Sequence, residues 1–369
     1  MKKKLAIICA SEDQLPLVNK AKEMGIETHC FAWDKPYYNA CKIVADYYHP
    51  ISILEKDLIL EKCKEIQING VTSIINDYAV PTVAYIAQNM GLPGNRYEDM
   101  LIACNKYKTR QAFLKNGVGS PRFVIARNGE NPDLSGLQYP IIIKPTDRCA
   151  SVGVEKVSNE SDAIEAIVNA QKLSFIGEAI VEEFVSGSEA TLDMISWQGN
   201  HYPIIISDTE TTGEPYYTKI GYHQPSKLSP DAQTKIISEA KKALDAFKFQ
   251  YGVSDIEVKI TETGEINIIE INPRMGADAT EKLVRLSTGY DLIKGTIDVA
   301  LGQFETPVFP YKKYSGVYFC SKNMKNLKHA IENKENDPDV VETEIYKVED
   351  ETLDRIGYLI YQSEKRRYW

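Results

Sequence analysis

Two segments in the second half of the chain, 255–258 and 268–272, carry carboxylates at a spacing that suits chemistry. They flank a polar stretch around Thr263-Gly264, whose composition is typical of a hairpin turn. If Thr263-Gly264 is a two-residue loop closed by the flanking glutamates, counting outward along both strands places Glu257 directly opposite Glu270. Opposed side chains share one face of a sheet, with Cβ atoms about 5 Å apart. The spacing therefore predicts a close pair of carboxylates.

Such a pair calls for a cation between its members, because the two charges repel by about 3 kcal/mol at an effective dielectric constant of about 20. Asn272 follows Glu270 by two residues and adds an amide oxygen on the same face. These oxygens suit a hard divalent ion such as Mg²⁺, which also binds substrate phosphates, whereas the thiol and imidazole ligands of zinc are absent here. The alternative is an edge hairpin whose glutamates face water, and a register slip of one residue would turn them to the opposite face.

Glu257, followed thirteen residues later by Glu270 and then by Asn272-Pro273-Arg274, resembles the metal-binding end of the ATP-grasp superfamily. This group includes biotin carboxylase, the carbamoyl phosphate synthetase large subunit, D-alanine–D-alanine ligase and amino-acid ligases. The chain most resembles the carboxylate–amine ligase and carbamoyl phosphate synthetase branch. The resemblance implies that Glu257, Glu270 and Asn272 hold Mg²⁺ against the phosphates of ATP, and that Arg274 contacts phosphate or the reaction intermediate.

The resemblance also assigns phosphate contacts to two lysines. Lys106 matches an Asp/Asn-Lys position at the start of an amphipathic helix, and Lys144 ends the short apolar strand 139–145. Ammonium groups act as point charges on phosphate oxygens. A lysine after an apolar run is otherwise usually a surface residue whose charged end reaches water.

Residues 146–153 match the phosphate-covering loop of the family, in which backbone amides approach phosphates closely. Ser151 and Gly153 are the contacts that the resemblance implies. Relatives usually carry several Gly and Ser residues here, but this segment has one glycine. Arg148 is a candidate to supply charge instead. The departure argues against a fast phosphoryl-transfer lid, though not against nucleotide binding.

The segment from Ile180 to Glu189 matches the connection between the two lobes of the family, whose backbone bonds the adenine edge. The resemblance places Glu182 and the backbone of Glu183 and Val185 on adenine. It places Glu189 on the ribose hydroxyls, since a carboxylate accepts well from a diol. Without the resemblance, the segment would be an ordinary strand end.

Three residues are candidates for contact with the second substrate. Asp77 follows a predicted strand at its carboxyl end, where a ligand of the first domain would lie, although capping of the next helix is the alternative. His223 lies in 209–224, a polar segment rich in Tyr and Gly that we expect to be irregular. A structural histidine is the alternative there. Arg274 is the third candidate.

The fold class expected is α/β and α+β. Residues 1–100 alternate strand and helix patterns, which predicts a Rossmann-like parallel layer with right-handed crossovers. The glycines of a dinucleotide-binding loop are missing after the first strand, so bound NAD is not expected. The resemblance divides the rest into a first ATP-grasp lobe (101–185), a second lobe with the metal site (186–305) and a small C-terminal β subdomain (306–369).

The composition of the chain argues against two classes of binding partner, nucleic acids and membranes. The formal net charge of −9 argues against non-specific binding to nucleic acid or to an anionic membrane surface, and no apolar run approaches the length of a membrane span. Seven scattered cysteines without a Cys-x-x-Cys spacing suit a reducing cytoplasm. The resemblance implies small-molecule carboxylate and amine substrates as partners. Dimers are common in the resembled group, so a homodimer is a further expectation.

The function expected from the resemblance is an ATP- and Mg²⁺-dependent ligase. Two Mg²⁺ ions, with Mn²⁺ as a substitute, would assist transfer of the γ-phosphoryl group to a substrate carboxylate, and an amine would then displace phosphate from the acyl phosphate. Arg274 and Lys144 would stabilise the reacting groups. Two alternatives stay open: a bicarbonate-using carboxylase of the purine or biotin type, and an ATP-binding scaffold that has lost turnover.

Overall fold

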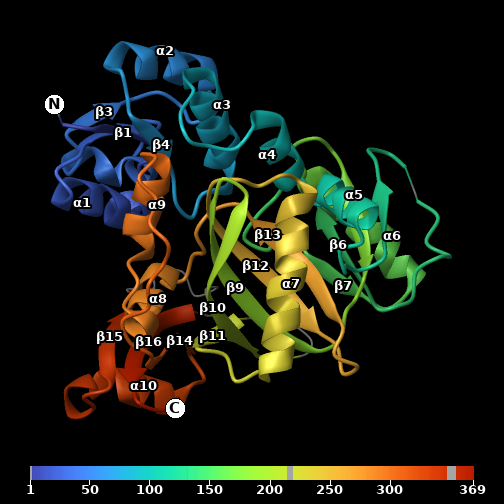
Figure 1. The fold of residues 1–369 in the computed structure, drawn as a ribbon. Coiled ribbons are helices and arrows are strands. Elements are labelled where there is room, and N and C mark those ends of the chain that lie inside the picture. The colour runs from blue at the N-terminus through green and yellow to red at the C-terminus, as the bar shows by residue number, and fades with distance from the viewer. Residues whose placement is uncertain (1, 131, 214–218, 347–354) are drawn as a thin grey trace.

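The computed structural model describes residues 2–130, 132–213, 219–346 and 355–369. Their strands form three sheets: a parallel sheet of four strands near the N-terminus, an antiparallel sheet of four strands, and an antiparallel sheet of eight strands (Figure 1). Within these residues, no helix combines the length and apolar character needed to cross a membrane.

The first domain has the predicted Rossmann-like layer, with strand order β3-β2-β1-β4 and parallel pairing throughout. Apolar side chains on alternate positions of β1 pack against α1 on one face of the sheet and against α2 and α3 on the other. The elements are β1 (Lys4–Ile8), α1 (Leu15–Glu23), β2 (Glu27–Phe31), β3 (Tyr47–His49), α2 (Lys56–Ile66), β4 (Gly70–Thr72), α3 (Val80–Met90) and α4 (Tyr97–Ala103).

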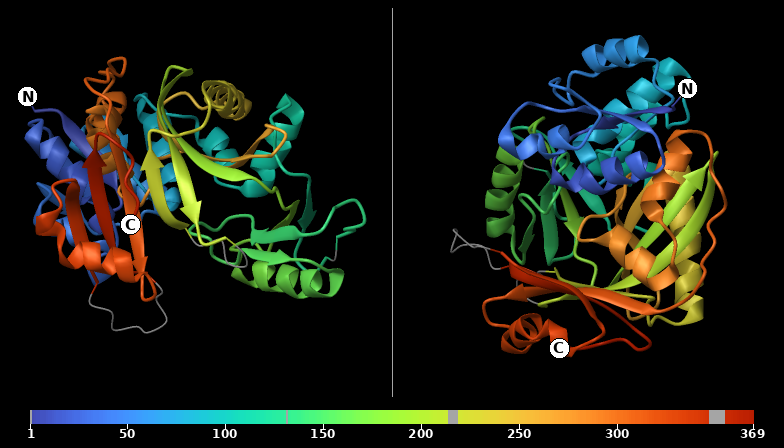
Figure 2. Two further views of the ribbon diagram at one scale, coloured as in Figure 1. Left: turned by 90° about the horizontal axis from the view of Figure 1, so that it is seen from below. Right: turned by 90° about the vertical axis from the view of Figure 1, so that its left-hand side faces the viewer.

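Residues 101–185 form an antiparallel sheet with strand order β5-β8-β6-β7 and two helices, of which α6 packs on this sheet and α5 places Phe113 in the apolar core of the following region. Helix α6 buries its alanine-rich face on the sheet, and in Figure 2 (left) it lies on the side that faces away from the second lobe. The elements are α5 (Lys106–Asn116), β5 (Phe123–Ala126), β6 (Ile141–Pro145), β7 (Glu155–Val157), α6 (Glu160–Leu173) and β8 (Ala179–Glu183).

The second lobe and the C-terminal strands share one sheet, with strand order β13-β12-β9-β10-β11-β14-β16-β15. Helix α7 covers one face of it through the apolar stripe that the sequence predicts. The elements are β9 (Ser188–Trp197), β10 (Asn200–Thr211), β11 (Lys219–Gln224), α7 (Pro230–Ala246), β12 (Gly252–Ile260), β13 (Ile266–Asn272), α8 (Thr280–Thr288), α9 (Leu292–Ala300), β14 (Tyr314–Ser321), α10 (Lys325–Glu332), β15 (Val340–Ile345) and β16 (Arg355–Ser363).

Two sequence-based expectations concern this sheet. The small C-terminal β subdomain expected over 306–369 contributes the strands β14, β15 and β16, which continue the second-lobe sheet through the β11–β14 pair (Figure 2, right). The expectation of an irregular segment over 209–224 is wrong at both ends. Strand β10 continues to Thr211, and Lys219–Gln224 is a strand; residues 214–218, which include Tyr216 and Tyr217, lie outside the described residues.

The first domain and the second lobe meet at α9. This helix packs beside β4 and contributes Ile297 to the core that contains α1. The approach is close: a Cβ atom on Gly70 would lie 2.5 Å from the backbone oxygen of Ala300. Glycine at this position lets α9 pack closely against the parallel sheet. This contact joins the first domain to the region that carries the β12–β13 hairpin.

Candidate active site

The hairpin β12–β13 places Glu257 directly opposite Glu270, so the predicted carboxylate pair is confirmed. The turn that connects the strands is not the predicted one. Ile260 pairs with Ile266, and the N–H of Thr261 donates to the carbonyl of Glu265 at 3.0 Å, so Glu262 and Glu265 are not a pair. Three residues, 262–264, therefore lie inside the Thr261–Glu265 hydrogen bond, where two were expected between paired residues.

A β-bulge restores the register between the turn and the carboxylates. Val258 pairs with Ile268, and the next pair is Glu257 with Glu270, which leaves Ile269 as an extra residue on β13. Extra residues of this kind shift every following side chain by one position. The bulge thus places Glu270 and Asn272 on the face that carries Glu257.

Each carboxylate is held by a lysine. Lys106 Nζ lies 3.0 Å from Glu270 Oε1, and Lys219 Nζ lies 2.8 Å from Glu257 Oε1. Burial alone would raise the pKa of Glu270, but the charges of Lys106 and Lys144 lower that pKa to about 2. The lysines therefore offset the repulsion that the sequence argument assigned to a metal ion. Lys219 was not found from the sequence, because it lies in the segment expected to be irregular.

The remaining predicted ligand, Asn272, is oriented by Asp255. The amide Nδ2 of Asn272 donates to Asp255 Oδ2 at 3.2 Å, which leaves the amide oxygen as the atom that can bind a cation. Two carboxylates and an amide oxygen on one face fit Mg²⁺, which prefers oxygen ligands and also takes oxygens from phosphates. No group of three or more His, Cys, Asp or Glu side chains suited to a metal occurs within the described ranges.

Asp255 belongs to a second acidic pair that the sequence analysis did not find. It lies opposite Asp193 in the β9–β12 ladder, and both side chains are buried. Burial raises the pKa of Asp255 to about 6, and burial together with the nearby Asp255 charge raises the pKa of Asp193. Arg274 Nη1 lies 3.6 Å from Asp255 Oδ2 and supplies the balancing charge.

Arg274 joins the hairpin to the first domain. Its Nε and Nη2 atoms donate to the two carboxylate oxygens of Asp77 at 2.9 and 3.0 Å. Asp77 and Arg274, both candidates for substrate contact, are therefore brought together. The helix cap that was the alternative role for Asp77 is instead provided by the neighbouring Asn76. Its side chain accepts a hydrogen bond from the N–H of Ala79 at 3.0 Å.

Lys144 and Glu182 lie in a buried ion-pair cluster with Arg110 from α5. Lys144 Nζ is 2.8 Å from Glu182 Oε2, and Arg110 Nε is 2.7 Å from Glu182 Oε1. Burial would raise the pKa of Glu182, but the two cations lower it. The Glu182 carboxylate, predicted to contact adenine, is thus already neutralised by two side chains. Arg110 was not predicted as a site residue, because an arginine in an amphipathic helix is usually exposed and nothing in the sequence indicates its pairing with Glu182.

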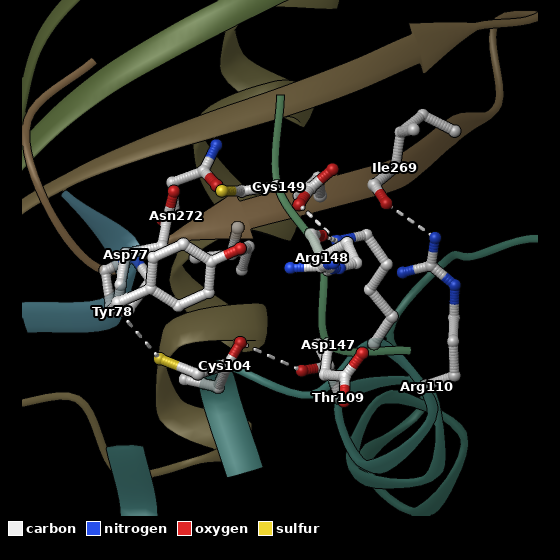
Figure 3. A pocket seen from close by; sticks show the side chains of 15 residues that line it. Asp77, Tyr78, Cys104, Thr109, Arg110, Asp147, Arg148, Cys149, Ile269 and Asn272 are labelled. Atoms are coloured by element: carbon white, nitrogen blue, oxygen red, sulfur yellow. Dashed lines mark hydrogen bonds and ion pairs between the residues drawn. The ribbon is translucent and has the colours of Figure 1, made fainter. Parts of the chain in front are cut away.

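The loop after β6 lies beside Lys106 and the acidic pair. Lys106 Nζ donates to the backbone oxygen of Arg148 at 2.5 Å, and Asp147, Arg148 and Cys149 line a pocket with Glu270 and Asn272 (Figure 3). The Arg148 side chain donates to the Leu173 carbonyl at 2.6 Å and its guanidinium lies 3.9 Å from the centre of the Phe175 ring. Arg148 therefore packs the loop in this conformation and does not extend toward the lysines.

The two predicted phosphate contacts of this loop both have left-handed backbones, with φ of 56° at Ser151 and 72° at Gly153. At Gly153 a Cβ atom would lie 2.8 Å from Leu173 Cδ1, so a side chain there would clash with α6. Ser151 is exposed at the tip of the loop.

The lobe connection leaves β8 at Glu183 and enters β9 at Ser188. The Glu183 carboxylate accepts from the Gln138 N–H at 2.9 Å, and Val185 lies just beyond the strand. Glu189 lies 2.6 Å from Lys259 Nζ and lines a small pocket with Lys219 and Glu257. The predicted ribose ligand therefore shares the second-lobe side of the site with the carboxylate pair.

His223 does not reach the site. Its side chain has no exposed surface, its Nδ1 lies 3.1 Å from the Tyr361 hydroxyl, and its Nε2 lies 3.5 Å from Glu210 Oε1. Burial lowers its pKa despite the neighbouring carboxylate. These contacts are those of a structural histidine, the alternative stated above.

The fold and the converging charges define a two-lobed nucleotide-binding class with an acidic, oxygen-ligand centre. Residues 137–282 match the family model described as "ATP-grasp domain". This segment of the chain is therefore similar to the ATP-grasp domain, and the relatives and structures below are consistent with that likeness.

Individual relatives are distant. The chain is 26% identical over 301 residues to the alanine–anticapsin ligase of Bacillus subtilis (strain 168), which covers 72% of this chain and 63% of that protein. It is 23% identical to carnosine synthase 1 of Gallus gallus, over 79% of this chain and 34% of that protein. The chain thus spans less than two thirds of the length of these curated relatives.

Solved structures match over almost the whole chain. The L-amino acid ligase from Bacillus licheniformis superposes with a TM-score of 0.80 at 21% identity, covering 99% of this chain and 94% of that one. The phosphoribosylglycinamide synthetase from Anaerococcus prevotii superposes with a TM-score of 0.76 at 24% identity, covering 99% and 95%. At these identities the superpositions establish the fold.

Proposed function

We propose that this protein is an ATP-dependent carboxylate–amine ligase. The observation that carries the proposal is the convergence of Glu257, Glu270 and Asn272 on one sheet face, with Lys106 and Lys219 paired to the two carboxylates. Relatives named alanine–anticapsin ligase and D-alanine–D-alanine ligase favour the same class of reaction.

ATP would lie between the lobes, with adenine at the backbone of Glu183 and Val185 and the ribose at Glu189. The phosphates would contact Lys106, Lys144 and the backbone of the loop at Ser151 and Gly153. Glu182 would act on the nucleotide through Lys144, whose ammonium group it holds. Mg²⁺ bound by Glu257, Glu270 and Asn272 would neutralise charge on the γ-phosphoryl group.

The reaction needs no covalent bond to the protein. An oxygen of the substrate carboxylate attacks the γ-phosphorus of ATP, the bond to the β-phosphate oxygen breaks, and ADP leaves. The amine nitrogen then attacks the acyl carbon, and inorganic phosphate leaves as the amide forms. Lys144 and Arg274 would stabilise the transferred phosphoryl group and the acyl phosphate. Asp77, which holds Arg274, places this chemistry at the junction with the first domain.

A bicarbonate-using carboxylase is the second candidate. Structures of N5-carboxyaminoimidazole ribonucleotide synthetase and of biotin carboxylase superpose on the chain with TM-scores of 0.78 and 0.73. The third candidate, an ATP-binding scaffold without turnover, has the glycine-poor phosphate loop in its favour.

Trapping with hydroxylamine separates the three candidates. An acyl phosphate exists before the amine arrives, so hydroxylamine should convert it to a hydroxamate of the acid substrate, with one ADP per product. The screen would combine amino acids and small carboxylates with ATP, Mg²⁺ and hydroxylamine, and Lys144→Ala would serve as the impaired control. ADP release that requires bicarbonate and yields no organic hydroxamate would replace the ligase by the carboxylase. Absence of ADP release in every combination would leave the scaffold.

Several finer points belong to the same proposal. Two Mg²⁺ ions, with Mn²⁺ as a substitute, follow from the resemblance. A homodimer is proposed on the same ground. A reducing cytoplasm is the proposed location, because all seven cysteines are free thiols and five of them are buried.

A further inference from the structure

The bulge at Ile269 decides which face of the hairpin carries Glu270. Without it, the ladder that begins at the Ile260–Ile266 pair would continue uninterrupted and would pair Glu270 with Ile256. Ile256 is buried in the core beneath α7. A hairpin with this turn and a regular ladder would therefore direct Glu270 into an apolar core and away from Glu257.

A bulge residue needs a partner for its backbone outside the ladder, because it has none across the strands. Here the Ile269 carbonyl accepts a hydrogen bond from Arg110 Nη2 at 2.6 Å (Figure 3). The Arg110 side chain is 2% exposed, and it comes from α5, a helix that packs against α7 and shares its apolar core with the hairpin. This bond is partly shielded from solvent, and a bond from a charged donor is stronger than one from a neutral donor. Loss of the donor would leave the partly buried carbonyl without this partner, which is destabilising.

We infer that Arg110 is a positioning residue for the metal centre: by holding the Ile269 carbonyl, it keeps the bulge in β13 and thereby keeps Glu270 and Asn272 on the face of Glu257. The inference rests on the proposed function, because it concerns the ligands of the proposed ion. Arg110 is not a ligand of the proposed ion. It acts through its hydrogen bond to the backbone carbonyl of Ile269, the residue before Glu270.

The same guanidinium also reaches the nucleotide lobe. Its Nε atom pairs with Glu182, and Glu182 holds Lys144. One buried side chain thus connects a proposed phosphate contact of the first lobe to the metal ligands of the second. This arrangement offers two routes by which a change at Arg110 could impair the enzyme, and the test has to separate them.

The test compares wild type with Arg110→Lys and Arg110→Met. Lysine keeps a positive charge beside Glu182, but its shorter, flexible side chain lacks the fixed fork by which two guanidinium nitrogens meet Glu182 and the Ile269 carbonyl. Mn²⁺ binding is titrated by electron paramagnetic resonance in the presence of a saturating, non-hydrolysable ATP analogue. Loss of a residue that orients metal ligands lowers metal affinity by about 10- to 100-fold, and we expect this loss in both variants. Arg366→Lys is the matched control, since Arg366 is equally enclosed in ion pairs at the C-terminal end of the chain, and it should leave Mn²⁺ affinity unchanged.

Amide hydrogen exchange over 266–272 provides the readout that separates the two routes. Faster exchange in this segment together with weaker Mn²⁺ binding supports the inference. Mn²⁺ affinity within threefold of wild type overturns it, and so does weaker binding with unchanged exchange, which would place the effect on Lys144. If wild type itself binds no Mn²⁺ with the nucleotide, the proposed function fails, while the exchange measurement still tests whether Arg110 holds the bulge.

Discussion

Replacement of Glu270 by glutamine tests the charge balance of the site without any ligand. Taken alone, the opposed pair of Glu257 and Glu270 predicts that the change relieves repulsion and stabilises the metal-free protein. The structure reverses that sign, because Lys106 lies 3.0 Å from the Glu270 carboxylate and the pKa of Glu270 is lowered from 4.5 to about 2. The ionised carboxylate is therefore a net stabilising group in the folded state.

The size of the effect follows from the pKa. A shift of one pH unit corresponds to about 1.4 kcal/mol, so the full difference amounts to about 3 kcal/mol. The Glu270 side chain is 29% exposed, and solvent screens part of its interaction with Lys106. We expect Glu270→Gln to lower the free energy of unfolding by about 1–2 kcal/mol at pH 7.

The pH dependence gives a second, independent check on the sign. A carboxylate whose pKa is lower in the folded state contributes stability above its unfolded pKa and loses it as the pH falls toward the folded value. The difference between wild type and Glu270→Gln should thus be constant above pH 4.5 and should shrink between pH 4.5 and about 2. Urea unfolding in the presence of EDTA measures it. Glu262→Gln, at an exposed position of the same hairpin, is the control and should change stability by less than about 0.5 kcal/mol. A Glu270→Gln protein that is as stable as wild type at pH 7 would refute the reasoning.

Three further predictions concern the surroundings of the carboxylates. Asp77→Asn should lower the free energy of unfolding by about 2 kcal/mol in urea, because it weakens two charged hydrogen bonds to Arg274; an unchanged unfolding midpoint would contradict this. His223→Gln should reduce thermal stability but leave the KM for ATP within about twofold, and a large rise in that KM would return His223 to the site. ATP with Mg²⁺ should raise the melting temperature well above the rise caused by GTP with Mg²⁺, since only a ligand bound to the native state stabilises it. Equal shifts for both nucleotides would count against adenine recognition at Glu183 and Val185.

The fold was most predictable where apolar periodicity alone determines the element. The parallel layer, α7 and the hairpin strands follow this rule, and their cores consist of the apolar positions expected. Strand β11 did not, because its buried positions include Gln224 and His223. Gln224 accepts from Ser207 at 2.9 Å and donates to Ser315 at 3.3 Å, so the strand is buried through hydrogen bonds between distant segments. A pattern of apolar residues cannot reveal burial of that kind.

The site residues that belong to a family motif were predictable from the sequence. They are Glu257, Glu270 and Asn272 with Lys106 and Lys144, and the structure brings them together. Lys219, Arg110 and Asp255 were not found, although each contacts a predicted residue. Their partners lie 38, 72 and 17 positions away along the chain, and only the three-dimensional arrangement identifies them.

The pairing of Glu257 with Glu270 was predicted correctly from an assumed two-residue turn. The actual turn is longer, and a bulge that was not predicted compensates for the difference. Two residues separated by an odd number of positions can oppose each other only if the loop has an even number of residues or one strand contains a bulge. The separation here is thirteen, and the loop between Ile260 and Ile266 has five residues, so a bulge is required. The sequence offers no signal for its place, because Ile268 and Ile269 are both isoleucines and either could leave the ladder. What selects Ile269 is the donor that meets its carbonyl, and that donor comes from a helix more than 150 residues earlier in the chain. The geometry of the acidic centre is therefore a property of the contact between α5 and the hairpin and not of the hairpin alone.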